Sequence, residues 1–148
     1  MGKHFKGTEA EERALGAYVK LARAARAAMA YARVGLEEAG LTLGQFAVLE
    51  ALYHVGPLPH GELARRILTS AGNLTTVIDN LELQGLAKRL KNPDDKRFAF
   101  ASITPTGRRL MARIFPAHVR RITDVMGRLK PEDQEFLGEL CRRLGTGK

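Results

Sequence analysis

The sequence predicts a mainly helical protein of the α+β class, in which a lobe of short helices and one β-hairpin lies between long helices at the two ends of the chain. The first observation is size: 148 residues, 45% of them hydrophobic, suffice for a single domain with a buried core over residues 1–148. The second is an amphipathic helix over about residues 71–82, which two strand-like segments follow. The third is a long apolar stripe in the helices expected near both termini.

The first element is an N-terminal helix expected over about residues 8–39. Leu15, Val19 and Met29 share one stripe at helical spacing, and Gly40 ends the helix. Thirty helical residues span about 45 Å, which is long for a domain of this size. Much of the stripe therefore needs a partner outside one compact domain.

The central lobe is expected over about residues 42–103 and begins with three helices. Thr42, with Gln45 three residues later, forms a capping box that starts the first of them. Glu62–Leu68 makes a short helix, and Thr69–Ser70 caps the next one. A short helix, a tight turn and an amphipathic helix together make a helix-turn-helix arrangement.

A two-stranded β wing is expected to follow this arrangement. Leu86–Lys91 and Phe98–Ile103 have the composition of strands, and the second alternates between two faces. The charged loop 92–97 joins them. The lobe is therefore predicted to be a winged helix-turn-helix.

Two helices are expected to complete the chain over residues 104–148. Thr104 and Pro105 form a typical helix start, and this helix runs to about Leu129 with a possible bend at Pro116. A last helix runs from Pro131 to Leu144. Long helices at both ends of a winged core indicate that residues 8–39 and 104–148 form a dimer.

Charge and composition narrow the function classes. The chain has 24 Lys and Arg against 16 Asp and Glu, and its net charge of +8 favours a polyanionic partner, most often nucleic acid. Because there is neither a long apolar run nor an apolar signal core, we expect a cytoplasmic protein with no membrane partner. Cys141 is the only cysteine, so an internal disulfide is ruled out. We find no catalytic constellation or metal-ligand spacing, and expect no enzyme, metal or cofactor.

The helix over residues 71–82 is the strongest candidate for a DNA-reading element. One face is apolar, and the opposite face carries short hydrogen-bonding side chains that suit base edges in a major groove. These side chains are Ser70, Asn73, Thr76, Asp79 and Asn80. The alternative is an ordinary surface helix followed by a solvated charge run, but the neighbouring segments favour DNA reading.

Several motifs, in order and at their spacing, resemble the MarR family of winged helix-turn-helix transcriptional regulators. They are Leu41-Thr42-x-x-Gln45-Phe46-x-Val48-Leu49, Glu62-Leu63-Ala64, Ser70-x-x-Asn73-x-Thr75-x-x-Ile78-Asp79-x-Leu81-Glu82-x-x-Gly85-Leu86, Pro93-x-Asp95-x-Arg97, Ile103-Thr104-x-x-Gly107 and Pro116-x-His118. The resemblance covers nearly the whole chain. It implies a homodimeric regulator, most often a repressor, that binds a pseudo-palindromic double-stranded DNA operator with two winged lobes on consecutive major grooves.

The resemblance also implies roles for the wing. Arg97 matches an arginine that enters the minor groove, and Asp95 matches the aspartate that holds it. A guanidinium suits the negative potential of a narrow minor groove. The sequence departs from the family pattern at Lys96, where arginine is frequent, and at Pro59-His60, where a Ser or Thr cap is frequent.

The expected DNA-binding residues fall into two groups. The recognition helix has no Lys or Arg, so base contacts are expected from its short polar side chains and from close backbone approach at a glycine. These residues are Ser70, Gly72, Asn73, Thr75 and Thr76. Phosphate contacts are expected from Arg65, Arg66, Lys88, Lys96 and Arg97. The arginines of the C-terminal segment are better explained as solvated helix faces.

A small-molecule effector is a further expectation that comes from the resemblance. Relatives bind small aromatic, often phenolic, effectors between the dimer helices and the winged lobe. The candidate lining residues are Tyr18, Tyr31, Phe46, Tyr53, His54, Phe115 and His118. Aromatic residues at helical spacing are more often core, and His54 with His118 either pack or bind a metal or an anionic effector. Cys141 is better explained as a buried or bystander thiol than as an oxidant sensor.

Two other function classes stay open. A winged helix can serve as a protein-interaction module without reading DNA, and the near-neutral charge of residues 41–103 permits this. An enzyme is the least favoured class, because no nucleophile is paired with a base.

Overall fold

The computed structural model describes residues 5–91 and 99–146, and within them it has six α-helices and three β-strands. The elements are α1 (Glu9–Glu37), α2 (Leu43–Val55), β1 (Leu58–Pro59), α3 (His60–Arg66), α4 (Ala71–Leu83), β2 (Ala87–Lys91), β3 (Ala99–Ile103), α5 (Pro105–Met126) and α6 (Pro131–Thr146). The prediction of a mainly α winged helix-turn-helix with long terminal helices is confirmed. No helix in this part of the chain combines the length and apolar character that crossing a membrane requires.

The chain divides into two compact units. One is Arg33–Val119, which contains the helix-turn-helix and the sheet; the other consists of Met1–Ala32 and Arg120–Lys148. Helices α1 and α5 each contribute to both units.

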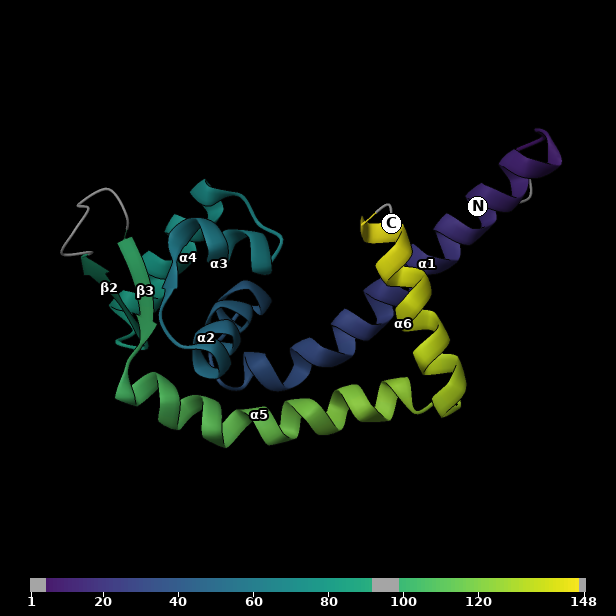
Figure 1. Ribbon diagram of the computed structural model, residues 1–148. Helices are drawn as coiled ribbons and strands as arrows, with labels where there is room; N and C mark the ends of the chain where they lie inside the picture. Colours follow the sequence, from purple (N-terminus) through teal and green to yellow (C-terminus); the bar gives the residue numbers. More distant parts are fainter. Residues whose placement is uncertain (1–4, 92–98, 147–148) are drawn as a thin grey trace. The chain divides into compact units, whose positions relative to one another are not determined.

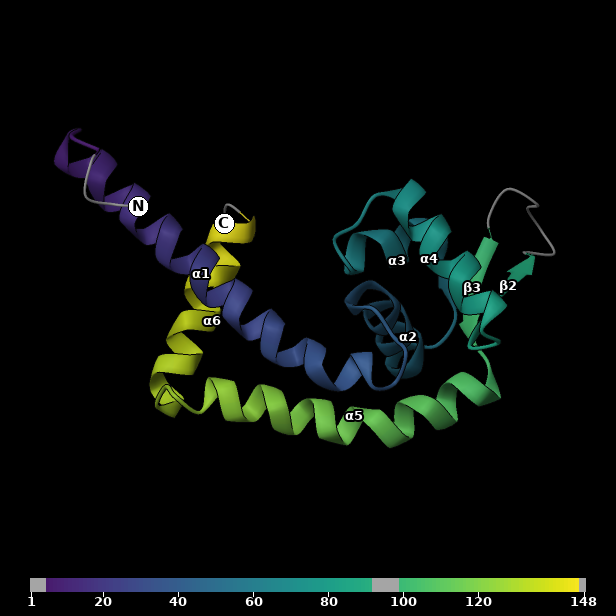
Figure 2. The same cartoon turned by 180° about the vertical axis from the view of Figure 1, so that it is seen from behind.

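The core of the Arg33–Val119 unit lies between the helices and one face of the sheet. Its fully buried side chains come from five helices, because Leu36 of α1 is one of them, and from one central strand. They include Val48, Leu49 and Leu52 of α2, Leu63 of α3, Leu74, Ile78 and Leu81 of α4, Ala101 of β3 and Met111 of α5. Figures 1 and 2, which view the chain from opposite sides, both place β2 and β3 beside α4.

The sheet has three antiparallel strands in the order β1-β3-β2. Leu58 pairs with Ala101, and Arg89 pairs with Ala101 from the other side. The prediction of two strands was therefore incomplete, because β1 was missed. A two-residue strand shows no alternation, and Pro59 lacks the N–H that strand patterns assume, which confines it to an edge.

Local hydrogen bonds fix the helix starts that the sequence predicted. The backbone N–H of Thr42 donates to Gln45 Oε1 at 2.8 Å, and the Gln45 N–H donates to Thr42 Oγ1 at 3.2 Å, which confirms the capping box. At the start of α5, Thr104 Oγ1 accepts from the Gly107 N–H at 3.0 Å and donates to the Gly85 carbonyl at 2.7 Å. These bonds connect the first turn of α5 to Gly85, which follows the end of α4.

Helix α3 lies two residues earlier than predicted, because the turn to α4 uses the end of the expected helix. The Leu68 N–H donates to the Arg65 carbonyl at 3.3 Å, and the Thr69 N–H donates to the Ala64 carbonyl at 3.0 Å. This pattern is a Schellman motif, which places Leu68 in the left-handed region at φ 55°. The side chain of Leu68 is 92% exposed.

The Met1–Ala32 and Arg120–Lys148 unit has almost no core of its own. Among its described residues only Ala32 is buried. Large apolar side chains of α1 and α6 are exposed instead, among them Tyr18, Phe136 and Leu144. Helix α5 ends at Met126 rather than near Leu129, and α6 begins at Pro131 as predicted.

Candidate DNA-binding surface

Helix α4 separates a buried face from an exposed polar face. Leu74, Ile78 and Leu81 are fully buried, and Val77 is partly buried against them. The five residues predicted to contact bases are all exposed and lie at the N-cap and in the first turns of α4. They are Ser70, Gly72, Asn73, Thr75 and Thr76. The structure therefore brings this predicted group together on one surface.

Most polar side chains at the start of α4 already make hydrogen bonds within the helix or its cap. Ser70 Oγ accepts from the Asn73 N–H at 3.2 Å, as an N-cap residue does. Asn73 Nδ2 donates to Thr69 Oγ1 at 2.6 Å. Thr75 Oγ1 donates to the Ala71 carbonyl at 3.0 Å, and Thr76 Oγ1 donates to the Gly72 carbonyl at 3.4 Å. The hydroxyl protons of both threonines thus point back into the helix.

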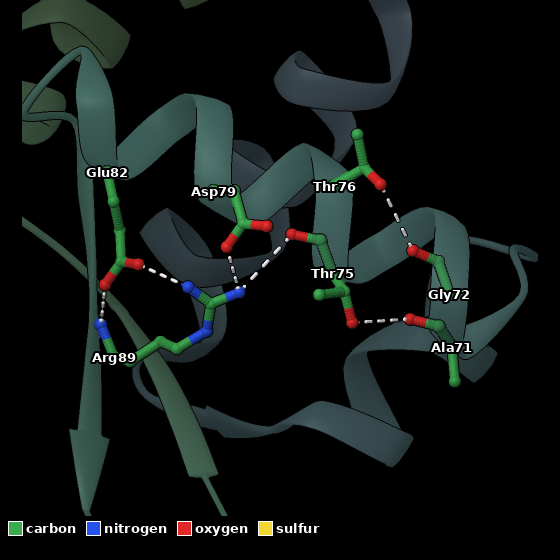
Figure 3. Close-up of polar contacts among 7 residues, drawn as sticks. All are labelled: Ala71, Gly72, Thr75, Thr76, Asp79, Glu82 and Arg89. Atoms are coloured by element: carbon green, nitrogen blue, oxygen red, sulfur yellow. Dashed lines mark hydrogen bonds and ion pairs between the residues drawn. The ribbon is translucent and has the colours of Figure 1, made fainter.

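An arginine on the first wing strand joins β2 to α4 (Figure 3). The backbone N–H of Arg89 donates to Glu82 Oε1 at 2.6 Å, and its Nη1 forms an ion pair with Glu82 Oε2. Nη2 lies 2.6 Å from Asp79 Oδ1 and donates to the Thr75 carbonyl at 3.3 Å. We call Arg89, Asp79 and Glu82 with the Thr75 carbonyl the Arg89 clamp.

The Arg89 clamp fixes the charge state of its arginine. Burial acts to lower the pKa of Arg89, but the hydrogen bonds and charges of Asp79 and Glu82 outweigh it and raise this pKa. No role was assigned to Arg89 in the sequence analysis. The available signal was the spacing of Thr75, Asp79 and Glu82, which puts them on one helix face beside the hairpin.

His60, the first residue of α3, lies close enough to the clamp to feel its charges. Partial burial lowers the pKa of His60, the positive charge of Arg89 lowers it further, and Asp79 opposes both. His60 is therefore biased towards its neutral form.

The predicted phosphate contacts are placed unevenly. Arg65 of α3 and Lys88 of β2 are exposed. Arg66 is also exposed but forms an ion pair with Glu62 at 2.9 Å. Asp95, Lys96 and Arg97 lie outside the described residues.

Five of the candidate effector residues form a ring cluster between α2 and α5. The ring centroids of Phe46 and His118 are 4.3 Å apart, and those of His54 and Phe115 are 4.8 Å apart. Tyr53 contacts His54 edge-on at 5.0 Å. Tyr18 and Tyr31 belong to the other unit, where they are 68% and 44% exposed.

The remaining candidate groups are not gathered into a site. Cys141 is exposed on α6, which excludes the buried thiol and leaves the bystander thiol of the two expected alternatives. In residues 5–91 and 99–146, no three His, Cys, Asp or Glu side chains are grouped so as to hold a metal ion.

Comparison with known proteins agrees with this architecture. A profile of the MarR family matches residues 41–98. The transcriptional regulator MhqR of Bacillus subtilis is 36% identical over 134 residues, which cover 90% of this chain and 92% of MhqR. The crystal structure of the MarR family regulator Sco3205 of Streptomyces coelicolor, in complex with DNA, superposes with a TM-score of 0.86 at 28% identity and covers 98% of this chain and 92% of that one. NadR in complex with 4-hydroxyphenylacetate superposes with a TM-score of 0.74 at 28% identity, covering 88% and 92%.

A short helix, a turn, an amphipathic helix with its polar face outward and a β wing define the winged helix-turn-helix fold. The family and the relative that match this chain are transcriptional regulators and not enzymes. The extent of the similarity is specific to one group of these regulators. The chain belongs to the MarR family.

Proposed function

We propose that this protein binds a pseudo-palindromic operator as a homodimer, acts in the cytoplasm as a repressor, and is released from DNA by a small aromatic effector. The observation that carries DNA reading is the exposed polar face of α4, with Ser70, Gly72, Asn73, Thr75 and Thr76 at its start. The N-terminal part of a recognition helix is the part that reaches base edges in this class of fold. Sco3205, a relative of this chain, was crystallised with DNA.

Selection of bound sequences from random DNA, followed by titration at several salt concentrations, tests this proposal. Asn73→Ala and Thr76→Ala should relax preference at one symmetric pair of positions, in half-sites whose centres lie roughly 10 base pairs apart. Their salt dependence should hardly change, because neither side chain is charged. Failure to select any sequence would contradict DNA reading and favour a protein-interaction module.

Variants of the proposed phosphate-contacting residues separate affinity for the DNA backbone from recognition of bases. Arg65→Ala and Lys88→Ala should weaken binding to all sequences and flatten the salt slope by about one unit per contact. Arg66→Ala is the comparison within the same helix, because Arg66 lies next to Arg65 in α3 but is paired with Glu62, and it should change the salt slope less. If the Arg65 and Lys88 variants keep the parent's salt slope, these residues do not contact phosphates.

The homodimer is proposed from the nearly absent core of the terminal unit. A unit with Ala32 as its only buried described residue cannot be stabilised by its own apolar burial. The exposed apolar side chains of Tyr18, Phe136 and Leu144 would find that burial against a second copy. Sedimentation should therefore give a dimer at micromolar concentration, and a folded monomer there would contradict the proposal.

The effector is proposed from the ring cluster of α2 and α5. Phe46, Tyr53, His54, Phe115 and His118 bring apolar ring faces and ring nitrogens together, a combination that suits a phenol or an aromatic acid. NadR, a structural relative, was crystallised with 4-hydroxyphenylacetate. If this ligand raises the Tm of the parent but not of a His54→Ala variant, the cluster is the site. An equal shift in both would exclude it, and Tyr31→Ala tests in the same way a candidate lining residue of the other unit.

A further inference from the structure

The exposed face of the recognition helix has no cationic hydrogen-bond donor, and its side-chain donors are the amide groups of Asn73 and Asn80 and the hydroxyl of Ser70. It carries no Lys or Arg, the usual donors to guanine O6 and N7 in a major groove. Its charged side chains, Asp79 and Glu82, are both acceptors. The chemistry of this face is therefore set by its hydroxyl and amide groups.

The two threonines have already used their only donor. A hydroxyl has one proton, and in Thr75 and Thr76 it is donated to the carbonyl four residues earlier, as Figure 3 shows. Their lone pairs remain available, and both residues are exposed. Asn73 likewise uses an amide proton on Thr69 Oγ1 at 2.6 Å. Thr76 lies one helical turn from Gly72, where no side chain obstructs a close approach.

The guanidinium of the Arg89 clamp is held by acceptors that belong to α4 itself. Both Nη atoms of Arg89 are engaged, Nη1 by Glu82 and Nη2 by Asp79 and the Thr75 carbonyl. The clamp takes up one carboxylate oxygen of Asp79, whose side chain is still 54% exposed. Asp79 thus adds a further acceptor to the exposed face, and the guanidinium of Arg89 balances its negative charge.

Resting on the proposed function, we propose that Thr75 and Thr76 of α4 recognise exocyclic amino groups of the operator, adenine N6 and cytosine N4, and do not read guanine N7 or O6. These amino groups are the only hydrogen-bond donors that bases present in the major groove. Thr76 Oγ1 is the principal acceptor. The competing possibility is a rotation of the threonine hydroxyls on binding, which would convert them into donors to guanine.

Base analogues in the selected operator test this inference. Adenine is replaced by purine and cytosine by 2-pyrimidinone, each lacking the amino group, and guanine by 7-deazaguanine, which lacks the N7 acceptor. At a symmetric pair of positions beneath α4, loss of the amino group should weaken binding of the parent protein by about tenfold. Where the operator has guanine beneath α4, its replacement by 7-deazaguanine should change the affinity of the parent and of Thr76→Val by the same factor.

Two controls separate recognition from weakened base pairing. Hypoxanthine in place of guanine removes a pairing hydrogen bond but leaves the major-groove edge unchanged, so it should have little effect beneath α4. Thr76→Val, which lacks the acceptor oxygen, should lose sensitivity to the missing amino group, whereas Thr76→Ser should retain it. Because the comparison is made between DNAs for each protein, small changes in protein stability cancel.

The outcomes are distinguishable. If amino-group removal affects Thr76→Val as strongly as the parent at every position, or if 7-deazaguanine weakens binding of the parent about tenfold and that of Thr76→Val hardly at all, the inference is overturned. A protein that selects no sequence, or binds without salt dependence, overturns the proposed function and this inference with it. A protein that selects an operator and fails only the analogue test leaves DNA reading intact.

Discussion

Leu68 has a backbone conformation that leucine rarely adopts. Its φ of 55° places Cβ close to the following carbonyl, and its side chain is 92% exposed, so no burial compensates. Leu68→Gly should therefore raise the free energy of unfolding by about 1 kcal/mol, after allowance for the extra chain entropy of glycine. Leu68→Ala keeps the Cβ and should give no gain. Urea unfolding of the three proteins checks this, and equal stability of the Gly and Ala variants would contradict it.

His60 should make stability depend on pH. Burial first, and the charge of Arg89 second, hold its pKa below the usual value of about 6.5. The contribution is complete above that usual value, where His60 is neutral in both states, and is lost as the pH falls through the folded-state pKa, because the unfolded chain takes up the proton first. The free energy of unfolding should therefore fall more steeply below pH 6.5 in the parent than in His60→Gln. Identical slopes for the two proteins would rule out a contribution from His60.

Helix α4 and strand β2 are joined as elements by the Arg89 clamp. A double-mutant cycle of Arg89→Met and Glu82→Gln should give a coupling of about 1 kcal/mol, because the pair is only about one-third exposed and shares a backbone hydrogen bond. The exposed pair of Arg33 and Glu37 is the control, and its coupling should be about 0.3–0.5 kcal/mol. Unfolding measurements check both cycles, and equal couplings would show that the clamp is an ordinary surface pair.

Helix α5 begins against the backbone of the wing. A Cβ added at Gly107 would overlap the Leu86 carbonyl oxygen and lie 2.8 Å from Ile103 Cγ1. Because backbone cannot move aside as a side chain can, Gly107→Ala should lower the free energy of unfolding by about 2–3 kcal/mol. Gly72→Ala, which meets nothing within 4 Å, should raise it by up to about 1 kcal/mol through helix propensity. Thermal unfolding compares the two variants, and a neutral Gly107→Ala would mean that the start of α5 can move away from Leu86.

The sequence was sufficient to predict elements defined by local rules. The capping box of Thr42 and Gln45 and the N-cap at Ser70 were predicted because each depends on residues at most three positions apart. Strand β1 was missed because its existence depends on pairing of Leu58 with Ala101, more than forty positions away. The clamp was missed for a related reason: which cation meets Asp79 and Glu82 is decided by where the hairpin packs. The candidate site was thus predictable as a list of exposed residues, but its hydrogen bonding was not.

At the scale of the whole molecule, one unit has a core and the other has Ala32 as its only buried described residue. If the proposed homodimer supplies the missing burial, folding and association are one equilibrium, and Tm should rise with protein concentration. Leu144→Glu, at a 70% exposed apolar position of α6, should lower Tm and strengthen this dependence. Lys130→Glu, which reverses a charge just before α6 without touching its apolar side chains, is the control. A Tm independent of concentration would contradict coupled folding.

Both edges of the small sheet resist unwanted strand pairing. On one side β1 is only two residues long and ends in Pro59, which offers no N–H to an approaching chain. On the other side β2 carries Lys88 and Lys91, whose charges discourage edge-to-edge aggregation. Lys88 therefore protects solubility as well as being a proposed phosphate contact. Replacement of Lys88 by a β-branched apolar residue would favour aggregation. If such a variant failed to bind DNA, the cause would be precipitation of the protein and not the loss of a phosphate contact.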